Sequence, residues 1–82
     1  MNNFAKIPAI LADRNIFHKM EEFHFDARWA EELEKFFKAE KAVNSVDYEV
    51  VFNFEDYPPV NGYLRVYKDG RFNLFTKIPD AM

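Results

Sequence analysis

The residue types that enzymes use as nucleophiles are nearly absent from this 82-residue chain. It has no Cys, and Ser45 and Thr76 carry its only aliphatic hydroxyl groups. Nucleophilic catalysis needs such a group beside an activating base, but Ser45 lies at an expected helix–strand junction, where a hydroxyl usually bonds local backbone. With only two glycines, Gly62 and Gly70, the chain has no glycine-rich loop to hold a phosphate. We therefore expect that the protein is not an enzyme.

His18 and His24 are the side chains that can titrate near neutral pH. In a helix, His18 and Glu22 would stand one turn apart, a spacing from which imidazole and carboxylate can bind a metal. A metal site needs three or four converging ligands, so we favour surface or capping roles and expect no metal and no cofactor. Adjacent carboxylates are expected in solvent, whereas acid–base catalysis needs one carboxyl in an apolar pocket. These pairs are Glu21–Glu22, Glu31–Glu32 and Glu55–Asp56.

Charge is unevenly distributed along the second half of the chain, although the net charge is only −3. No Lys or Arg occurs between Ala42 and Leu64, where four acidic residues lie, and four bases follow between Arg65 and Lys77. Neutralisation between adjacent strands is the interpretation we favour. The alternative is an acidic surface offered to a basic partner. The net negative charge argues against a general nucleic-acid binder, which needs a basic surface.

Length and composition predict a single domain over residues 1–82. Ten Phe, four Tyr and one Trp supply apolar area for the core, and the absence of Cys fits a reducing compartment. The apolar run Ile7–Ala12 is too short for a signal peptide or a membrane span. Because the chain also starts at Met1, we expect a complete, soluble, cytoplasmic protein.

Two segments of the N-terminal half show helical patterns. Asp26 to about Ala42 is the clearer one, since Asp26 can cap the first turn and four apolar residues form one stripe. This stripe consists of Trp29, Leu33, Phe36 and Phe37. A helix over Pro8–Phe23 is our choice for the preceding segment, and the alternative is a short turn followed by a strand across Ile16–Phe25.

The C-terminal half alternates between apolar and polar residues with the period of a β-strand. Val46–Glu55 is the first strand, and Pro58 and Pro59 end it. A hairpin follows. A three-residue loop, Lys68–Gly70, pairs Val66 with Phe72 and Leu64 with Leu74, which gives one wholly apolar face. A two-residue loop would mix apolar and charged residues, so the three-residue loop is predicted.

The predicted fold is α+β, with one or two N-terminal helices packed on one face of a three-stranded antiparallel β-meander. The predicted core contains the apolar residues of the second helix and of the inward face of the meander, with three residues from the first helix. These are Trp29, Leu33, Phe36, Phe37, Tyr48, Val50, Phe52, Phe54, Leu64, Val66, Phe72, Leu74, Ile10, Phe17 and Met20.

The outward face of the meander is the surface whose composition is unusual. Aromatic side chains and arginines alternate on it, as they do at the energetic centres of protein interfaces and on platforms that stack single-stranded nucleic acid. The residues concerned are Tyr63, Arg65, Tyr67, Arg71 and Phe75. The alternatives are that the N-terminal arm covers this face, or that the rings and arginine stems only pack against each other.

A second candidate surface is the acidic connection between the first strand and the hairpin, Glu55–Gly62. Glu55, Asp56 and Tyr57 are followed by two prolines, which stiffen the loop and lower the entropy cost of binding. An ordinary strand-to-strand turn is the alternative.

These observations favour a non-enzymatic protein-binding module that occupies the surface of a larger protein or nucleoprotein. Its size and acidity resemble, in type only, phage- or mobile-element-encoded inhibitors of host machinery such as anti-CRISPR proteins. A single-stranded nucleic-acid binder and an antitoxin or immunity-type partner are the alternatives, and a homodimer is also compatible with the aromatic face. No membrane partner is expected.

Overall fold

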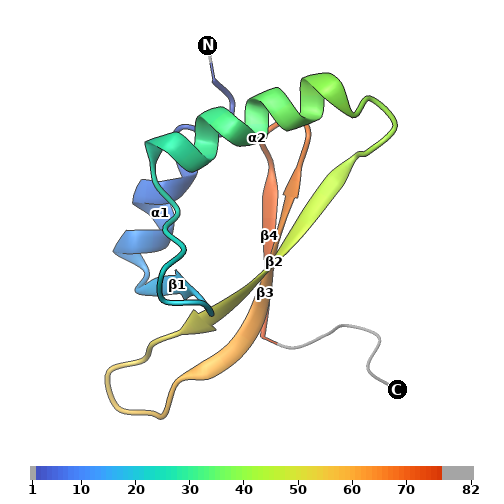
Figure 1. Cartoon of the computed structure of the whole chain (residues 1–82). Coiled ribbons are helices and arrows are strands. Elements are labelled where there is room, and N and C mark those ends of the chain that lie inside the picture. Colours follow the sequence, from blue (N-terminus) through green and yellow to red (C-terminus); the bar gives the residue numbers. More distant parts are fainter. Residues whose placement is uncertain (1, 77–82) are drawn as a thin grey trace, which may run out of the picture.

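In the described part of the chain, residues 2–76 of a computed structural model, two helices lie on one face of a four-stranded antiparallel sheet (Figure 1). The strands neighbour each other in the order β1-β2-β3-β4. The bounds are α1 Ile7–Asp13, β1 Ile16–His18, α2 Ala27–Ala39, β2 Ser45–Phe52, β3 Val60–Tyr67 and β4 Phe72–Phe75. The predicted α+β class is confirmed, but the meander of β2, β3 and β4 carries a fourth strand, β1, on its β2 side.

The first helix is shorter than the predicted Pro8–Phe23, and the residues after its end form the fourth strand. The helix ends at Asp13, and Asn15 adopts a left-handed backbone with φ 56°, which asparagine tolerates better than most residues. The Asn15 carbonyl accepts bonds from the backbone and the side-chain amide of Asn53, at 3.1 and 3.2 Å. Ile16 therefore enters the sheet beside Phe52. The alternative of a turn followed by a strand is thus correct for Ile16–His18, but the strand does not continue to Phe25.

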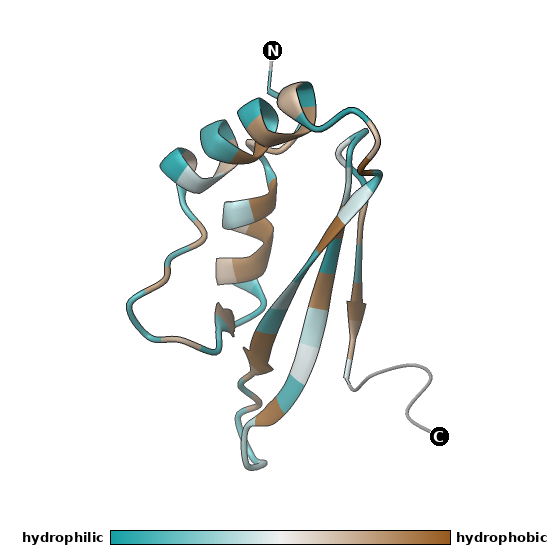
Figure 2. Ribbon diagram, turned by 45° about the vertical axis from the view of Figure 1, so that its right-hand side comes forward, coloured by the Kyte–Doolittle hydropathy of each residue, from teal (hydrophilic) through white to brown (hydrophobic). Residues whose placement is uncertain are grey.

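Helix α1 and the turn before it bury a different set of residues from the predicted one. Phe4, Ile7 and Leu11 are at most 2% exposed, while Met20, which the longer helix would have buried, is 59% exposed. The Phe4 ring stacks on Phe37 of α2 with 5.5 Å between centroids. Figure 2 shows the apolar sides of both helices turned toward the sheet. Ile10 is only half-buried, so its predicted core position is wrong.

Helix α2 begins as the sequence predicts. The Asp26 carboxylate accepts a bond from the Trp29 amide at 3.0 Å, which satisfies one of the free donors of the first turn. Trp29, Leu33 and Phe37 are buried, but Phe36 is 39% exposed. The predicted core position of Phe36 is wrong because Phe36 lies at the border of the buried stripe of α2, where its ring is partly in solvent.

Strands β2 and β3 pair through eight residues, from Ser45 opposite Tyr67 to Phe52 opposite Val60. The predicted inward face of β2 is confirmed, although β2 ends at Phe52, so Phe54 lies outside the strand and is 49% exposed. Val60, Asn61 and Gly62 belong to β3 and not to the preceding loop. No helix among residues 2–76 is long and apolar enough to cross a membrane.

The predicted three-residue hairpin loop is confirmed. Val66 faces Phe72 and Leu64 faces Leu74. The Gly70 amide donates to the Tyr67 carbonyl at 2.9 Å, the Tyr67 amide donates to the Arg71 carbonyl at 2.8 Å, and Gly70 has φ 96°. A turn followed by a glycine in the left-handed region is the expected geometry of such a loop.

The aromatic side chains between α2 and β2 form one cluster. The Trp29 ring meets both Phe25 and Tyr48 edge-on, with centroids 5.0 and 5.7 Å apart, and Phe23 and His18 extend the cluster toward β1. Edge-to-face contacts of this kind add stabilisation beyond the area they bury. Burial in this cluster raises the pKa of the Tyr48 hydroxyl.

Two neighbouring phenylalanines of α2 give a direct test of the packing. Phe37→Ala should lower the free energy of unfolding by about 3–5 kcal/mol, because it removes a ring that is 6% exposed and stacked on Phe4. Phe36→Ala should cost much less, because that ring is 39% exposed. Urea denaturation followed by circular dichroism measures both values, and equal losses would contradict the packing described here.

Gly62 gives a second test. A Cβ atom there would overlap the backbone carbonyl oxygen of Phe75 and the ring of Phe52, so Gly62→Ala should destabilise the fold by about 1–3 kcal/mol. Asn61→Ala, at the exposed position next to it, is the control and should change little. Differential scanning calorimetry compares the two variants. An unaltered melting temperature for Gly62→Ala would show that β2 and β4 approach Gly62 less closely than described here.

Candidate functional site

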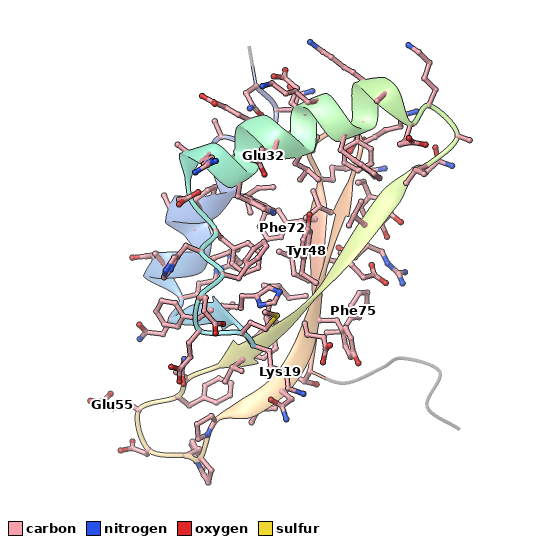
Figure 3. The ribbon with its side chains drawn as sticks, viewed as in Figure 1. Lys19, Glu32, Tyr48, Glu55, Phe72 and Phe75 are labelled. Carbon is pink, nitrogen blue, oxygen red and sulfur yellow. The ribbon has the colours of Figure 1, made fainter. Side chains whose placement is uncertain are left out.

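The face of the sheet that points away from the helices, called the outer face below, carries most of the predicted binding residues. Alternation along β3 and β4 places Tyr63, Arg65, Tyr67 and Phe75 there, opposite to the buried Leu64 and Val66. Figure 3 shows Phe75 on the side of the strands away from the helices, whereas Tyr48 and Phe72 point toward them. With Arg71, which directly precedes β4 on the same side, the structure thus brings five of the eight predicted residues together on one surface.

Arg65 lies in the middle of the outer face and is held from two directions. Its guanidinium donates two bonds to the Asp47 carboxylate on β2, at 2.8 and 3.0 Å, and lies 5.5 Å from the centroid of the Phe75 ring. Bonding to Arg65 lowers the pKa of Asp47 below its ordinary value. Asp47 and Arg65 are directly opposite each other, so the favoured reading of the charge pattern, neutralisation between adjacent strands, is confirmed for this pair.

Arg71 extends the outer face toward the hairpin turn. It directly precedes β4, and its guanidinium lies 5.5 Å from the centroid of the Tyr67 ring while bonding the Asp69 carboxylate at 2.8 Å. The Tyr67 hydroxyl accepts a bond from the Asn73 amide at 3.3 Å. The rings and arginines therefore pack on each other, as one of the sequence alternatives anticipated.

The outer face also includes residues that the sequence did not place there. Phe17 was predicted in the core but is 51% exposed, since it pairs with Val51 and points opposite to Ile16. Beside it, Lys19 bonds Glu49 at 3.4 Å. Ile16, Phe17 and His18 alternate between the two faces of β1. This alternation could have indicated the position of Phe17, but the prediction of a helix across these residues did not consider it.

The N-terminal arm does not cover the outer face. The Asn2 side-chain amide donates to the Ala30 carbonyl of α2 at 3.1 Å, and Phe4 is buried between the helices and the sheet. Asn3 lies against Gly70 at the hairpin turn. The segment over residues 2–6 therefore closes the helical side of the molecule, and the alternative in which it covers the outer face is wrong.

The acidic loop lies at the other end of the sheet from the hairpin turn (Figure 3). Glu55, Asp56 and Tyr57 are all exposed, with Tyr57 72% exposed. Because β3 begins at Val60, about 23 Å of strand separates this loop from Tyr67. The loop and the hairpin end of the outer face are therefore separate surfaces, in agreement with the prediction of the loop as a second candidate surface.

His18 is held in place by one hydrogen bond and by an aromatic neighbour. Its Nδ1 accepts a bond from the Met20 amide at 2.9 Å, and its ring stacks on Phe23 with 4.2 Å between centroids. Burial lowers the pKa of the imidazole below 6.5, which favours the neutral ring. Among residues 2–76 no group of three or more His, Cys, Asp or Glu side chains is placed to hold a metal ion.

Searches for similarity find no matching family model, no matching curated protein and no matching solved structure.

The ion pair between Asp47 and Arg65 gives a test based on the titration of the Asp47 carboxyl. Because the pKa of Asp47 is lowered in the folded state, the pair stabilises the fold above the ordinary value of 3.8, and this contribution is lost as the pH falls through the lowered pKa. In Arg65→Gln, the pKa of Asp47 should rise toward 3.8, measured by carboxyl NMR.

Stability measurements complete this test. Asp47→Asn should lower the free energy of unfolding at pH 7 by no more than about 1 kcal/mol, because the pair is partly exposed, and the difference should vanish below the lowered pKa. Asp56→Asn, in the exposed loop, is the control and should have little effect at either pH. If Asp47 titrated normally in the unmodified protein, the pair would not form in solution.

Proposed function

We propose that this protein is a non-enzymatic binding module that docks its outer face against a larger protein. The observation that supports this proposal is a continuous layer of aromatic rings and paired charges on a sheet face that neither helix nor the N-terminal arm covers. Tyr, Phe and Arg are the residue types that contribute most to protein interfaces. Part of the Tyr63, Tyr67 and Phe75 surface stays accessible to solvent in the isolated chain.

The charges on this face favour a protein partner over nucleic acid. Lys19, Arg65 and Arg71 each lie within 3.4 Å of a carboxylate oxygen, on Glu49, Asp47 and Asp69 respectively. A single-stranded nucleic-acid platform needs unpaired positive charge along its groove in addition to stacking rings. In the described part of the outer face, each of these three cations already has an anionic partner, so the face offers apolar area with little net charge.

The same contacts prepare the surface for binding. A flexible arginine normally loses rotamer entropy when an interface forms. Arg65 is already fixed by two bonds to Asp47 and by the Phe75 ring, and Arg71 by Asp69 and Tyr67. The entropy cost of ordering these side chains is therefore met largely during folding.

Surface occupation is the mechanism that such a module can use. A small acidic domain that covers a working surface of a host macromolecular machine inhibits it without any chemistry of its own, and this remains our proposed role. Antitoxin or immunity proteins act in the same way on a different target.

The experiment uses a partner captured from a cell lysate on the immobilised chain, identified by mass spectrometry and then titrated against purified variants. Tyr67→Ala should weaken binding by about 2 kcal/mol or more, mainly through faster dissociation, because anchoring rings carry most of the binding energy. Tyr57→Ala is the matched control on the acidic loop and should have a smaller effect. Glu55→Lys with Asp56→Lys should mainly slow association.

The titration also separates the alternatives. Loss of binding with Tyr57→Ala but not with Tyr67→Ala would move the interface to the acidic loop. Tight binding of a single-stranded oligonucleotide that weakens steeply with salt would indicate nucleic-acid recognition, since counterion release causes such a dependence. Circular dichroism confirms that each variant is folded before its binding is interpreted.

A further inference from the structure

Strand β4 is an edge of the sheet whose residue types do not protect it from pairing with another strand. Within residues 2–76 it pairs only with β3, and its four residues, Phe72–Phe75, include no Pro and no charged side chain. Edge strands normally carry such residues because open backbone groups invite pairing with another chain. The other edge, β1, has three residues and packs against α1. Figure 2 shows β4 on the side of the sheet away from α1.

The hairpin bonding shows which backbone groups of β4 are free. The Tyr67 amide donates to the Arg71 carbonyl, and hydrogen-bonded pairs recur every second residue along an antiparallel ladder. Arg65–Asn73 and Tyr63–Phe75 are therefore the next bonded pairs. The N–H and C=O groups of Phe72 and Leu74 consequently point away from β3, toward the open edge.

We propose that β4 pairs with β4 of a second copy of this chain, antiparallel and with Asn73 facing the partner's Asn73. Phe72 then bonds the partner's Leu74 and Leu74 bonds the partner's Phe72, which uses both N–H and both C=O groups on each strand. No other antiparallel register satisfies both residues of both strands with partners that lie within β4. The two-fold axis runs perpendicular to the sheet, so the helices of both copies lie on the same side.

The side chains are self-complementary in this register. On the helical side, Phe72 and Leu74 are half-buried in the single chain, and each meets the other residue type across the axis, which adds a cross-strand apolar pair. On the outer face, Arg71, whose side chain is 78% exposed, stands opposite the partner's Phe75, a favourable combination of cation and aromatic ring.

A contact over four residues predicts a weak, concentration-dependent dimer, because stable interfaces usually bury roughly 1,200 Å² or more. The pairing joins two sheets into one of eight strands and places two outer faces side by side. It does not depend on the outer face binding another protein, and it is tested on the purified chain alone.

Sedimentation equilibrium over a wide concentration range is the primary measurement. The weight-average mass should rise from the 9.8 kDa of one chain toward twice that value. Asn73→Lys places two like charges directly across the axis and should weaken self-association by about tenfold or more. Asn73 is exposed, so the fold should survive. Asn61→Lys, at another exposed position of the outer face, is the control and should self-associate like the unmodified protein.

Charge exchange provides an independent check. Asn73→Glu alone should also weaken self-association, whereas an equimolar mixture of Asn73→Glu and Asn73→Lys should recover it as a heterodimer. Amide exchange at Phe72 and Leu74 should slow as the concentration of the unmodified protein rises. A mass of 9.8 kDa at every concentration up to the solubility limit would overturn the proposal. The proposal would also be overturned if neither Asn73→Lys nor Asn73→Glu weakened the dimer, or if the equimolar mixture of the two variants stayed monomeric.

Discussion

The register between β2 and β3 is the constraint on which the rest of the structure depends. Side chains alternate with a period of two, so a slip of one residue would invert both faces. A slip of two would keep the faces but would place Val60 or Leu64 against the Phe52 ring in the position of Gly62, where the ring leaves no room for a Cβ atom. One small residue therefore fixes which charges and rings meet on the opposite side.

The outer face follows directly from this register. Asp47 stands opposite Arg65 and Glu49 lies beside Lys19, so two acidic residues of β2 are neutralised by one base on each side of the strand. Arg65 stays in place because it also contacts Phe75. The result is an aromatic surface whose charges are internally paired, which is the property that favours recognition of a protein over recognition of nucleic acid.

The two edge strands of the sheet, β1 and β4, differ in how far other parts of the chain pack against them. At β1, the chain returns from α1 through the left-handed Asn15, and the loop after β1 packs Phe23 against His18. At β4, the strand is formed by a tight hairpin and its outward backbone groups have no partner among residues 2–76. Self-pairing at β4 would enlarge the outer face without changing the fold of either copy, so the two proposals are compatible but independent.

Local patterns in the sequence determined the cap at Asp26, the alternation of β2, the hairpin register and the membership of Tyr63, Arg65, Tyr67 and Phe75 in one surface. Each of these depends on neighbouring residues, which a single sequence displays. Only the tertiary structure decided the path of the segment before α2, because an apolar run containing Asn15 suits a helix or a strand until β2 offers an edge to pair with. That pairing moved Phe17 from the predicted core to the outer face. The tertiary structure also decided how far the acidic loop lies from the hairpin end, since the length of β3 depends on its pairing with β2.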